Sequence, residues 1–138
     1  MHTIENTIEI SAPTPRIVEA LTTEAGFRAW LNEAAIFDGT QLTLTFARPE
    51  ITRSQTLRVD RADAGGIAMT CTSQQSTPDW LGTKLAISVE GDRVRLVHAG
   101  YPEKNEYYQQ CAQGWAYFLG SLKGYLETGR GTPWPKIE

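Results

Sequence analysis

A long amphipathic segment near the C-terminus constrains the fold more strongly than any other feature of the sequence. Its spacing predicts one helix over residues 103–128, followed by glycines and closed by prolines. Apolar residues recur along it at intervals of three and four, which places them on one face. Because the preceding chain has the pattern of short strands, we expect a curved sheet wrapped around this face. The face comprises Tyr108, Cys111, Trp115, Phe118, Leu119, Leu122, Tyr125 and Leu126.

Alternation of apolar and polar residues predicts strands through most of that preceding chain. Two short helices are expected after the first strand, one over residues 15–21 with Thr14 as its N-cap and one over residues 23–31. Strands that follow one another without intervening helices form an antiparallel meander, so the predicted class is α+β, with a curved antiparallel sheet of about six to seven strands around the long C-terminal helix. The expected strands cover residues 3–10, 42–46, 52–60, 67–73, 81–90 and 93–99.

Composition and charge narrow the classes of function. The 138 residues show no repeat or linker, which predicts a single domain over residues 1–138. A formal net charge of −3 gives no electrostatic footprint for nucleic acid or for an anionic membrane. The N-terminus has no signal-peptide pattern, and no apolar run approaches the roughly 20 residues that span a bilayer. We therefore expect a cytoplasmic protein without membrane insertion.

The residues that usually carry metal or nucleophilic chemistry are sparse and scattered. Cys71 and Cys111 lie in apolar-periodic segments, which favours two free buried thiols, with a disulfide or a reactive thiol as the alternatives. His2 and His98 are far apart and form no metal-ligand pattern. Phosphate-binding loops and a nucleophile elbow are absent from the sequence. We therefore assign no catalytic residue, metal or cofactor, and whether the protein is an enzyme stays open, with a non-enzyme favoured.

Four segments resemble the family of homologues of the activator of the 90-kDa heat-shock protein ATPase. This family is part of the START-like (SRPBCC) superfamily, which has the Bet v 1-like helix-grip fold. The resemblance implies a hydrophobic cavity between the sheet and the C-terminal helix. It implies no universal catalytic residues, because members differ in what they bind, so function must be argued from the site. The segments are IEISAPTPRIVEALT (residues 8–22), FRAWL (27–31), WLGTKLAISVEGDRVRLVHAGYP (80–102) and GWAYFLGSLKGYLETGRGTP (114–133).

In such a fold, the helix face and the inward strand positions are candidates to line the cavity. The same residues would equally serve as ordinary core packing, and this alternative stays open. Aromatic side chains that combine an apolar face with a polar atom would suit a mixed ligand. The apolar candidates are Trp115, Tyr108, Cys111, Leu119, Phe118 and Leu122 from the helix, with Met69, Leu96 and Leu57 from the strands.

Polar residues in phase with apolar strand positions are the more informative candidates. Arg53 and Gln55 share the phase of Leu57, and His98 shares the phase of Leu96, so all three are predicted to face inward. Arg53 could pair with a ligand carboxylate or phosphate, and His98 could be a hydrogen-bond partner or a general base. Alternatively, Arg53 lies in solvent at a strand end and His98 is structural. A bulge would turn either residue to the other face.

Several other residues allow two interpretations. Trp30 and Trp80 could frame the cavity mouth or simply anchor a helix and a strand end. Trp134 is expected to cover a sheet edge or a dimer partner, and Ser121 to face solvent or lie close to the sheet. Ser73 continues the phase of the inward strand residues around it.

Three functions are compatible with these patterns. The favoured one is the binding of a small hydrophobic or amphipathic ligand in the cavity. The alternative implied by the resemblance is a co-chaperone or stress-related interaction with the 90-kDa heat-shock chaperone. A cyclase- or hydrolase-like enzyme that uses cavity residues, including a Cys111–His98 pair, is the third. Exposed sheet edges would allow a homodimer.

Overall fold

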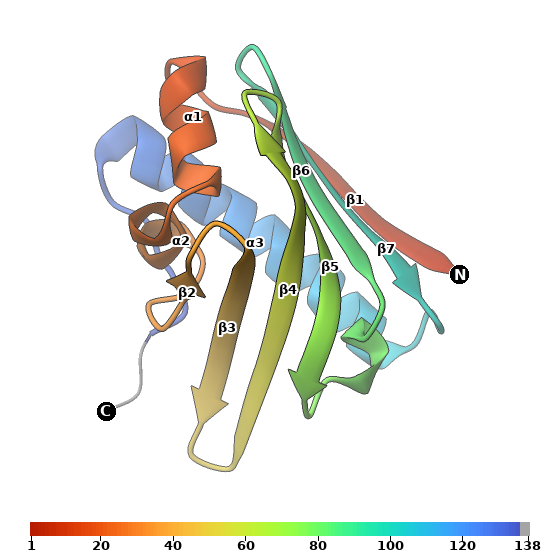
Figure 1. Cartoon of the computed structure of the whole chain (residues 1–138). Helices are drawn as coiled ribbons and strands as arrows, with labels where there is room; N and C mark the ends of the chain where they lie inside the picture. The colour runs from red at the N-terminus through yellow and green to blue at the C-terminus, as the bar shows by residue number, and fades with distance from the viewer. Residues whose placement is uncertain (136–138) are drawn as a thin grey trace.

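The computed structural model describes residues 1–135. Its centre is a seven-stranded antiparallel sheet in the order β1-β7-β6-β5-β4-β3-β2. Figure 1 shows the long helix α3 (Glu106–Thr128) crossing behind this sheet, with α1 (Thr14–Leu21) and α2 (Glu24–Trp30) together at one end. This arrangement confirms the predicted class, in which a curved sheet grips a terminal helix and two short helices follow the first strand.

From β2 to β7 the strands pair in chain order, whereas α1 and α2 connect β1 to β2, and β1 pairs with β7. The outermost strands of the sheet are therefore β1 and the very short β2, which the alternation did not predict. The predicted strand over residues 81–90 begins three residues late, because a 3-10 turn at Pro78–Trp80 precedes it and Gly82 has a φ of 82°. The strands are β1 (His2–Glu9), β2 (Ile36–Phe37), β3 (Gln41–Arg48), β4 (Ile51–Asp63), β5 (Gly66–Gln75), β6 (Lys84–Glu90) and β7 (Arg93–Tyr101).

Capping residues set the ends of the helices. Helix α3 begins at residue 106 rather than 103, because the Asn105 side chain accepts a hydrogen bond from the Tyr108 backbone N–H at 2.9 Å. It ends where Gly129 adopts a left-handed conformation with a φ of 84°. The prediction of Thr14 as the cap of α1 was wrong, since Thr14 is already helical and Pro13 is the cap.

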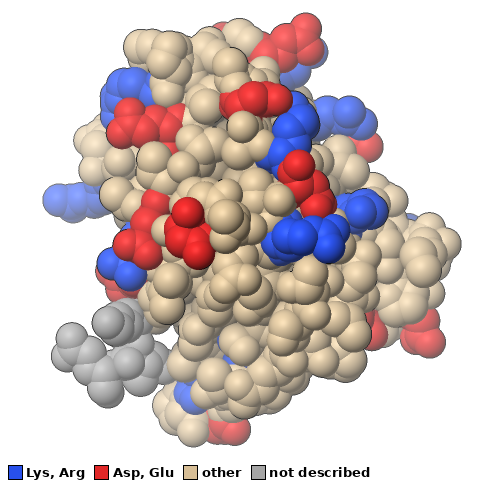
Figure 2. All heavy atoms as spheres, in the orientation of Figure 1, with Lys and Arg blue, Asp and Glu red and all other residues tan. Residues whose placement is uncertain are grey.

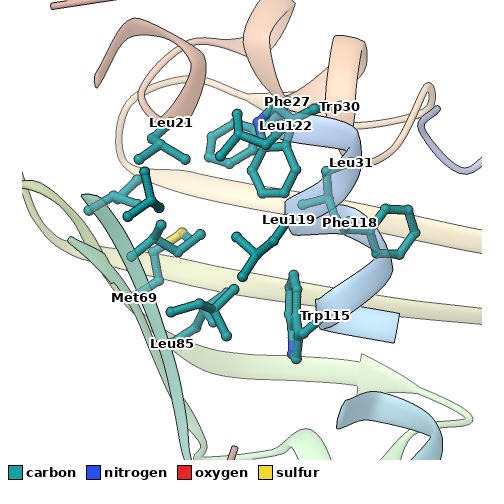
Figure 3. Packing of buried hydrophobic residues seen from close by; sticks show 14 of the residues in the cluster. Leu21, Phe27, Trp30, Leu31, Met69, Leu85, Trp115, Phe118, Leu119 and Leu122 are labelled. Carbon is teal, nitrogen blue, oxygen red and sulfur yellow. The ribbon is translucent and has the colours of Figure 1, made fainter. Parts of the chain in front are cut away.

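The interior is packed densely beside the two short helices. In Figure 3, Leu119 of α3 points toward Met69 and Leu85 of the sheet, whereas Phe118 points the opposite way. Leu21, Phe27 and Trp30 fill the end under α1 and α2, and all three are fully buried. Burial of a side chain of this size contributes about 1.5–3 kcal/mol. This end of the molecule therefore supplies much of the core, and any cavity lies toward the other end.

Two slips in the pairing of β4 with β5 affect which residues of these strands face inward. Pairing between β4 and β5 slips at Thr56/Leu57 and again at Val59/Arg61. Because of the first slip, Ser73 is exposed and not inward as its phase predicted. On its other side, β4 pairs with β3 in unbroken register, and Arg53 and Gln55 keep the inward phase predicted for them.

Ser121 ties three parts of the chain together. Its hydroxyl donates to the Trp30 carbonyl at 2.7 Å and accepts from the Thr132 backbone N–H at 2.7 Å. The side chain is buried, so of the two interpretations given to Ser121 the one in which it faces solvent was wrong. It joins helix α3 to the end of α2 and to the segment after α3, which lies against the candidate site described below.

Replacing Ser121 by alanine is expected to lower the free energy of unfolding by about 1–2 kcal/mol, because the buried Trp30 carbonyl loses its donor. Chemical denaturation of the purified variant measures this. Ser88→Ala is the control, since the Ser88 hydroxyl makes only one long contact of 3.4 Å, to the Arg95 carbonyl, on the outer face of β6. Equal stabilities of the two variants would contradict the role assigned to Ser121.

The surface shows no concentration of one charge on the side that Figure 2 displays. Lysine and arginine side chains lie among aspartates and glutamates there. Within residues 1–135, no helix is long and apolar enough to cross a bilayer. In the same range, no three His, Cys, Asp or Glu side chains come together as metal ligands.

Candidate functional site

A pocket of about 270 Å³ lies between helix α3 and the end of the sheet formed by β3 and β4. The segment after α3 and the 3-10 turn complete its walls. Helix α3 contributes residues between 107 and 118, and the two strands contribute residues between 46 and 55, so the site is built from segments far apart in the sequence. The lining residues are Leu31, Phe46, Arg48, Ile51, Arg53, Gln55, Trp80, Tyr107, Gln110, Cys111, Gly114, Trp115, Phe118 and Trp134.

Aromatic rings make up most of the apolar wall. The ring centroids of Trp80 and Trp115 are 6.0 Å apart, and those of Phe46 and Phe118 are 6.3 Å apart. Gly114 leaves a gap in the helix face, since nothing lies within 4 Å of the position that a Cβ atom would take. The wall is therefore flat-sided and apolar, and the missing side chain at Gly114 helps to keep the space open.

Trp134 closes one side of the pocket. Its ring packs edge-on against Phe46 with centroids 5.6 Å apart. Its backbone is bound to the end of α2, where its N–H donates to the Leu31 carbonyl at 3.0 Å. As one of the two expectations held, Trp134 covers the edge of β3 beyond β2, where its indole N–H donates to the Ala47 carbonyl at 3.4 Å. Its place beside the pocket was not predicted, because that place depends on how the chain returns after α3.

Three buried side-chain atoms have no hydrogen-bond partner within residues 1–135, and all three belong to pocket-lining residues. They are Arg53 Nε, Gln55 Oε1 and Trp80 Nε1. A buried polar atom without a partner costs about 1–3 kcal/mol, and such atoms are few in folded proteins. Two unpaired donors and one unpaired acceptor on an apolar wall are the arrangement expected of a site that orients a polar ligand.

Tyr107 lies next to these three unpaired atoms but does not supply a hydrogen-bond partner for them. Burial raises the pKa of the Tyr107 hydroxyl, which keeps it protonated, and the Arg53 charge and then the nearby Trp80 indole oppose that rise only in part. The two side chains are close enough to influence one another's electrostatics, yet they do not meet the geometry of a hydrogen bond. The Trp80 N–H therefore remains available to the pocket.

Two arginines place positive charge at the pocket. The Arg53 guanidinium carbon lies 5.7 Å from the centroid of the Tyr107 ring, and that of Arg48 lies 4.8 Å from the Trp134 ring. Neither arginine forms an ion pair with a carboxylate of the described residues. No lining residue is acidic. The pocket therefore has a positive, aromatic-supported rim with no internal counter-charge.

Gln55 is held in place at one end of its amide only. Its Nε2 donates to the Thr77 hydroxyl at 3.3 Å, and the side chain is 2% exposed. This bond turns Oε1 away from Thr77 and leaves it as a free acceptor. A ligand hydroxyl or N–H could donate to it.

His98 lies inward, as its phase predicted, but it belongs to a closed network rather than to the pocket lining. The Thr83 hydroxyl donates to the Trp80 carbonyl at 2.6 Å, so its oxygen accepts from His98 Nε2 at 2.9 Å. The Trp115 indole N–H donates to Nδ1 at 3.0 Å, and the Tyr101 hydroxyl lies 3.0 Å from the same nitrogen. The ring is therefore a neutral imidazole with the proton on Nε2.

The environment of His98 leaves no role in proton transfer. Burial lowers the pKa of the imidazole to about 3, and both ring nitrogens already have partners. The Cys111–His98 pair considered from the sequence does not form, because Nδ1 is occupied by Trp115 and Tyr101. His98 instead fixes the Trp115 indole, which forms part of the pocket wall, so it positions the site indirectly.

The two cysteines are free, and they have different environments. Cys71 is buried in the core, where burial raises the pKa of its thiol. Cys111 is half-buried and lines the pocket, so the expectation of two buried thiols holds for Cys71 alone.

The structure brings together some of the predicted cavity residues and separates others. Trp115, Cys111, Phe118, Arg53 and Gln55 line the pocket. Tyr108 lies elsewhere on α3, where its hydroxyl donates to the Thr3 carbonyl at 2.7 Å. Trp30 is an anchor whose indole N–H donates to the Ala20 carbonyl at 2.9 Å, whereas Trp80 lines the pocket. The remaining predicted residues pack in the core away from the pocket lining, and they are Leu119, Leu122, Leu57, Met69 and Leu96.

Sequence reasoning missed several pocket residues, and some of them carried a usable signal. Phe46 is the last apolar residue in the alternation of the predicted strand over residues 42–46, and Arg48 continues the same phase. Gly114 stands inside a helix, where glycine costs up to about 1 kcal/mol relative to alanine and therefore suggests a spatial reason. Tyr107 and Gln110 had no comparable signal, because they lie beside the apolar stripe rather than on it.

Comparison with known proteins places this architecture in a class. Neither a family model nor a curated protein matches the chain. Among solved structures, the Aha1 dimer from Colwellia psychrerythraea is similar over 95% of this chain and 100% of that one, with a TM-score of 0.80 and 26% identity. The AHSA1 protein from Silicibacter pomeroyi covers 94% of this chain and 100% of its own, with a TM-score of 0.77 and 15% identity.

A third solved structure has the same arrangement of sheet and helix. The structure of Ara h 8.0201 covers 91% of this chain and 97% of its own, with a TM-score of 0.69 and 13% identity. The sheet, the gripped helix and the pocket between them define a helix-grip protein. More particularly, the chain has the Aha1-like fold of the Bet v 1-like (SRPBCC) proteins, as the sequence motifs indicated.

Proposed function

We propose that this protein binds a small amphipathic molecule in the pocket between α3 and the β3–β4 end of the sheet. The observation that carries the proposal is the group of three unpaired polar atoms, Arg53 Nε, Gln55 Oε1 and Trp80 Nε1, on an otherwise aromatic wall. Leaving them unpaired costs stability in the free protein, and a ligand with matching groups recovers that free energy. Such a cost in the free state is common at binding sites.

The size of the pocket limits the ligand. A volume of about 270 Å³ lies just below the roughly 300–1,000 Å³ of typical small-molecule pockets. A compact ligand would fill it, with any larger part extending through the open side. This favours a compact ligand over a long-chain lipid.

Filling the gap at Gly114 tests this function. A phenylalanine at residue 114 would project into open space and occupy the pocket. Gly114→Phe is expected to weaken the binding of 2-naphthol, a neutral amphipathic probe, at least tenfold in calorimetric titration. Gly120→Phe is the control, because Gly120 lies on the exposed side of the same helix and has nothing within 4 Å of its Cβ position.

Two results would count against the proposal. One is that the unmodified protein binds neither 2-naphthol nor the two other aromatic probes described below. The other is equal affinity of the Gly114→Phe and Gly120→Phe variants, which would place the probe outside this pocket.

A protein-interaction role is the second candidate, and the similarity to the Aha1 dimer favours it. In this version the chain forms a homodimer and acts on the 90-kDa heat-shock chaperone in the cytoplasm. Sedimentation analysis tests the dimer. An unchanged chaperone ATPase rate on addition of the purified protein would reject the chaperone role.

A further inference from the structure

We propose that the ligand of this pocket is a small aromatic carboxylate, with its carboxylate group bound by Arg53. This inference rests on the proposed ligand-binding function and names its chemical class. It follows from three features of the pocket, namely an uncompensated guanidinium, a second unpaired N–H donor among the lining residues, and aromatic walls.

The charge of the ligand follows from Arg53. A guanidinium stays protonated at any pH that a folded protein tolerates, so a buried Arg53 Nε needs an acceptor. Among residues 1–135 no side chain supplies one, and the contact with the Tyr107 ring is through the ring face at 5.7 Å. Arg48 adds a second positive charge at the same pocket, and no acidic residue lines it. An anion is the partner that this set of groups lacks.

The kind of anion follows from the number and type of unpaired donors. Arg53 Nε and Trp80 Nε1 are two unpaired N–H donors in one small pocket, and a carboxylate offers two acceptor oxygens in a plane. Gln55 Oε1 would repel a carboxylate, so the anionic group lies toward the arginines. On a strand, residues two apart are separated by roughly 7 Å, so Gln55 faces a different part of the ligand and suits a hydroxyl or N–H donor there.

The apolar part of the ligand follows from the walls. Trp80, Trp115, Phe46 and Phe118 present ring faces and edges to a space of about 270 Å³. Aromatic rings pack against one another in offset or edge-on geometry with a gain beyond simple burial. A ring joined to a carboxylate by a short linker therefore matches both ends of the pocket.

The absence of a partner for Arg53 gives a prediction that distinguishes a role in ligand binding from a role in the stability of the fold. Because it has no hydrogen-bond or ion-pair partner among the described residues, Arg53→Met should not lower the melting temperature, and removal of an unpaired buried donor can raise it. Arg58→Met is the matched control on the same strand. Arg58 is exposed and paired with Asp60 at 2.9 Å, so it lies outside the pocket.

Calorimetric titration with two probes of equal size and different charge tests the inference. The unmodified protein and Arg58→Met are expected to bind 3-phenylpropanoate at least tenfold more tightly than 3-phenylpropanamide. Arg53→Met is expected to lose this preference while its melting temperature stays equal or rises. Equal affinity for the two probes, or an undiminished preference in Arg53→Met, would overturn the inference.

The neutral probe 2-naphthol separates this inference from the proposed function. If 2-naphthol binds and the two phenylpropanoic compounds bind equally, the pocket binds ligands and the carboxylate assignment is wrong. If the unmodified protein binds none of the three compounds, the assignment and the proposed function fail together.

Discussion

Replacing His98 by leucine is expected to lower the free energy of unfolding by about 2–5 kcal/mol. The imidazole is fully buried and accepts at Nδ1 from the Trp115 indole N–H, with the Tyr101 hydroxyl at the same distance of 3.0 Å. Leucine leaves both donors without a partner, at about 1–3 kcal/mol each. The Thr83 hydroxyl keeps its own acceptor, the Trp80 carbonyl, so it adds little to the loss.

A double-mutant cycle distinguishes this network from simple loss of packing. In a His98→Leu background, Tyr101→Phe removes one of the two unpaired donors and should cost less than it does in the unmodified protein. The measurement is urea denaturation of the four proteins. Strict additivity of the two substitutions would show that the hydrogen bonds to His98 contribute no coupling.

The lowered pKa of His98 also predicts how the stability of the protein depends on pH. Its pKa is about 3 in the folded protein and about 6.5 in the unfolded chain, so the unfolded chain takes up the proton first as the pH falls. Stability is therefore unaffected by this group above pH 6.5 and decreases between pH 6.5 and 3, by up to about 1.4 kcal/mol per pH unit. His98→Gln carries no titratable group at this position and lacks this decrease.

Measuring the stability of both proteins at pH 7.5 and at pH 4.5 isolates the contribution of His98. Over this range the unmodified protein should lose about 2–3 kcal/mol more stability than His98→Gln. The lowered pKa values of the Asp38 and Asp63 carboxyls, caused mainly by backbone hydrogen bonds, affect stability at lower pH and are common to both proteins. Parallel pH profiles would contradict the assignment of His98 as a buried neutral imidazole.

Replacing Gly26 by alanine is expected to lower the free energy of unfolding by about 2–3 kcal/mol, although alanine is the better helix former. Helix propensity alone would favour alanine by up to about 1 kcal/mol. A Cβ atom at Gly26, however, would lie 2.6 Å from both the Cα and the carbonyl oxygen of Ala20. These are backbone atoms, which no change of rotamer can move, so α1 and α2 must separate and overpacking outweighs the gain.

Gly114→Ala is the matched control for this prediction. It places the same methyl group on a helix at a position where nothing lies within 4 Å, so it should raise the free energy of unfolding by up to about 1 kcal/mol. Thermal and urea denaturation of the two variants should give changes of opposite sign. A stabilising Gly26→Ala would show that the contact between α1 and α2 relaxes freely.

Local patterns were sufficient for most of the architecture. The spacing of Trp115, Leu119 and Leu122 predicts α3 because helical periodicity is a property of neighbouring residues. Alternation likewise predicts the inward phase of Arg53 and Gln55, and the register with β3 keeps it. Ser73 shows the limit of this reasoning, since its exposure depends on a slip in pairing with another strand.

The candidate site depended on contacts that such patterns do not contain. Trp134 reaches the pocket through backbone hydrogen bonds to the end of α2, more than a hundred residues earlier in the chain. His98 faces inward as predicted, yet its partners Thr83, Tyr101 and Trp115 decide that it is neutral and structural.

The sequence by itself determined the order of the elements and the class of the fold, and it indicated the inward phase of Arg53, Gln55 and His98, because periodicity and capping act between near neighbours. Only the tertiary structure decided which inward residues fill the core and which surround open space. That division depends on how tightly α1, α2 and α3 approach the sheet. At one end Leu119 and Leu122 fill the interior, and at the other Gly114 and the unpaired atoms of Arg53, Gln55 and Trp80 leave room for a ligand.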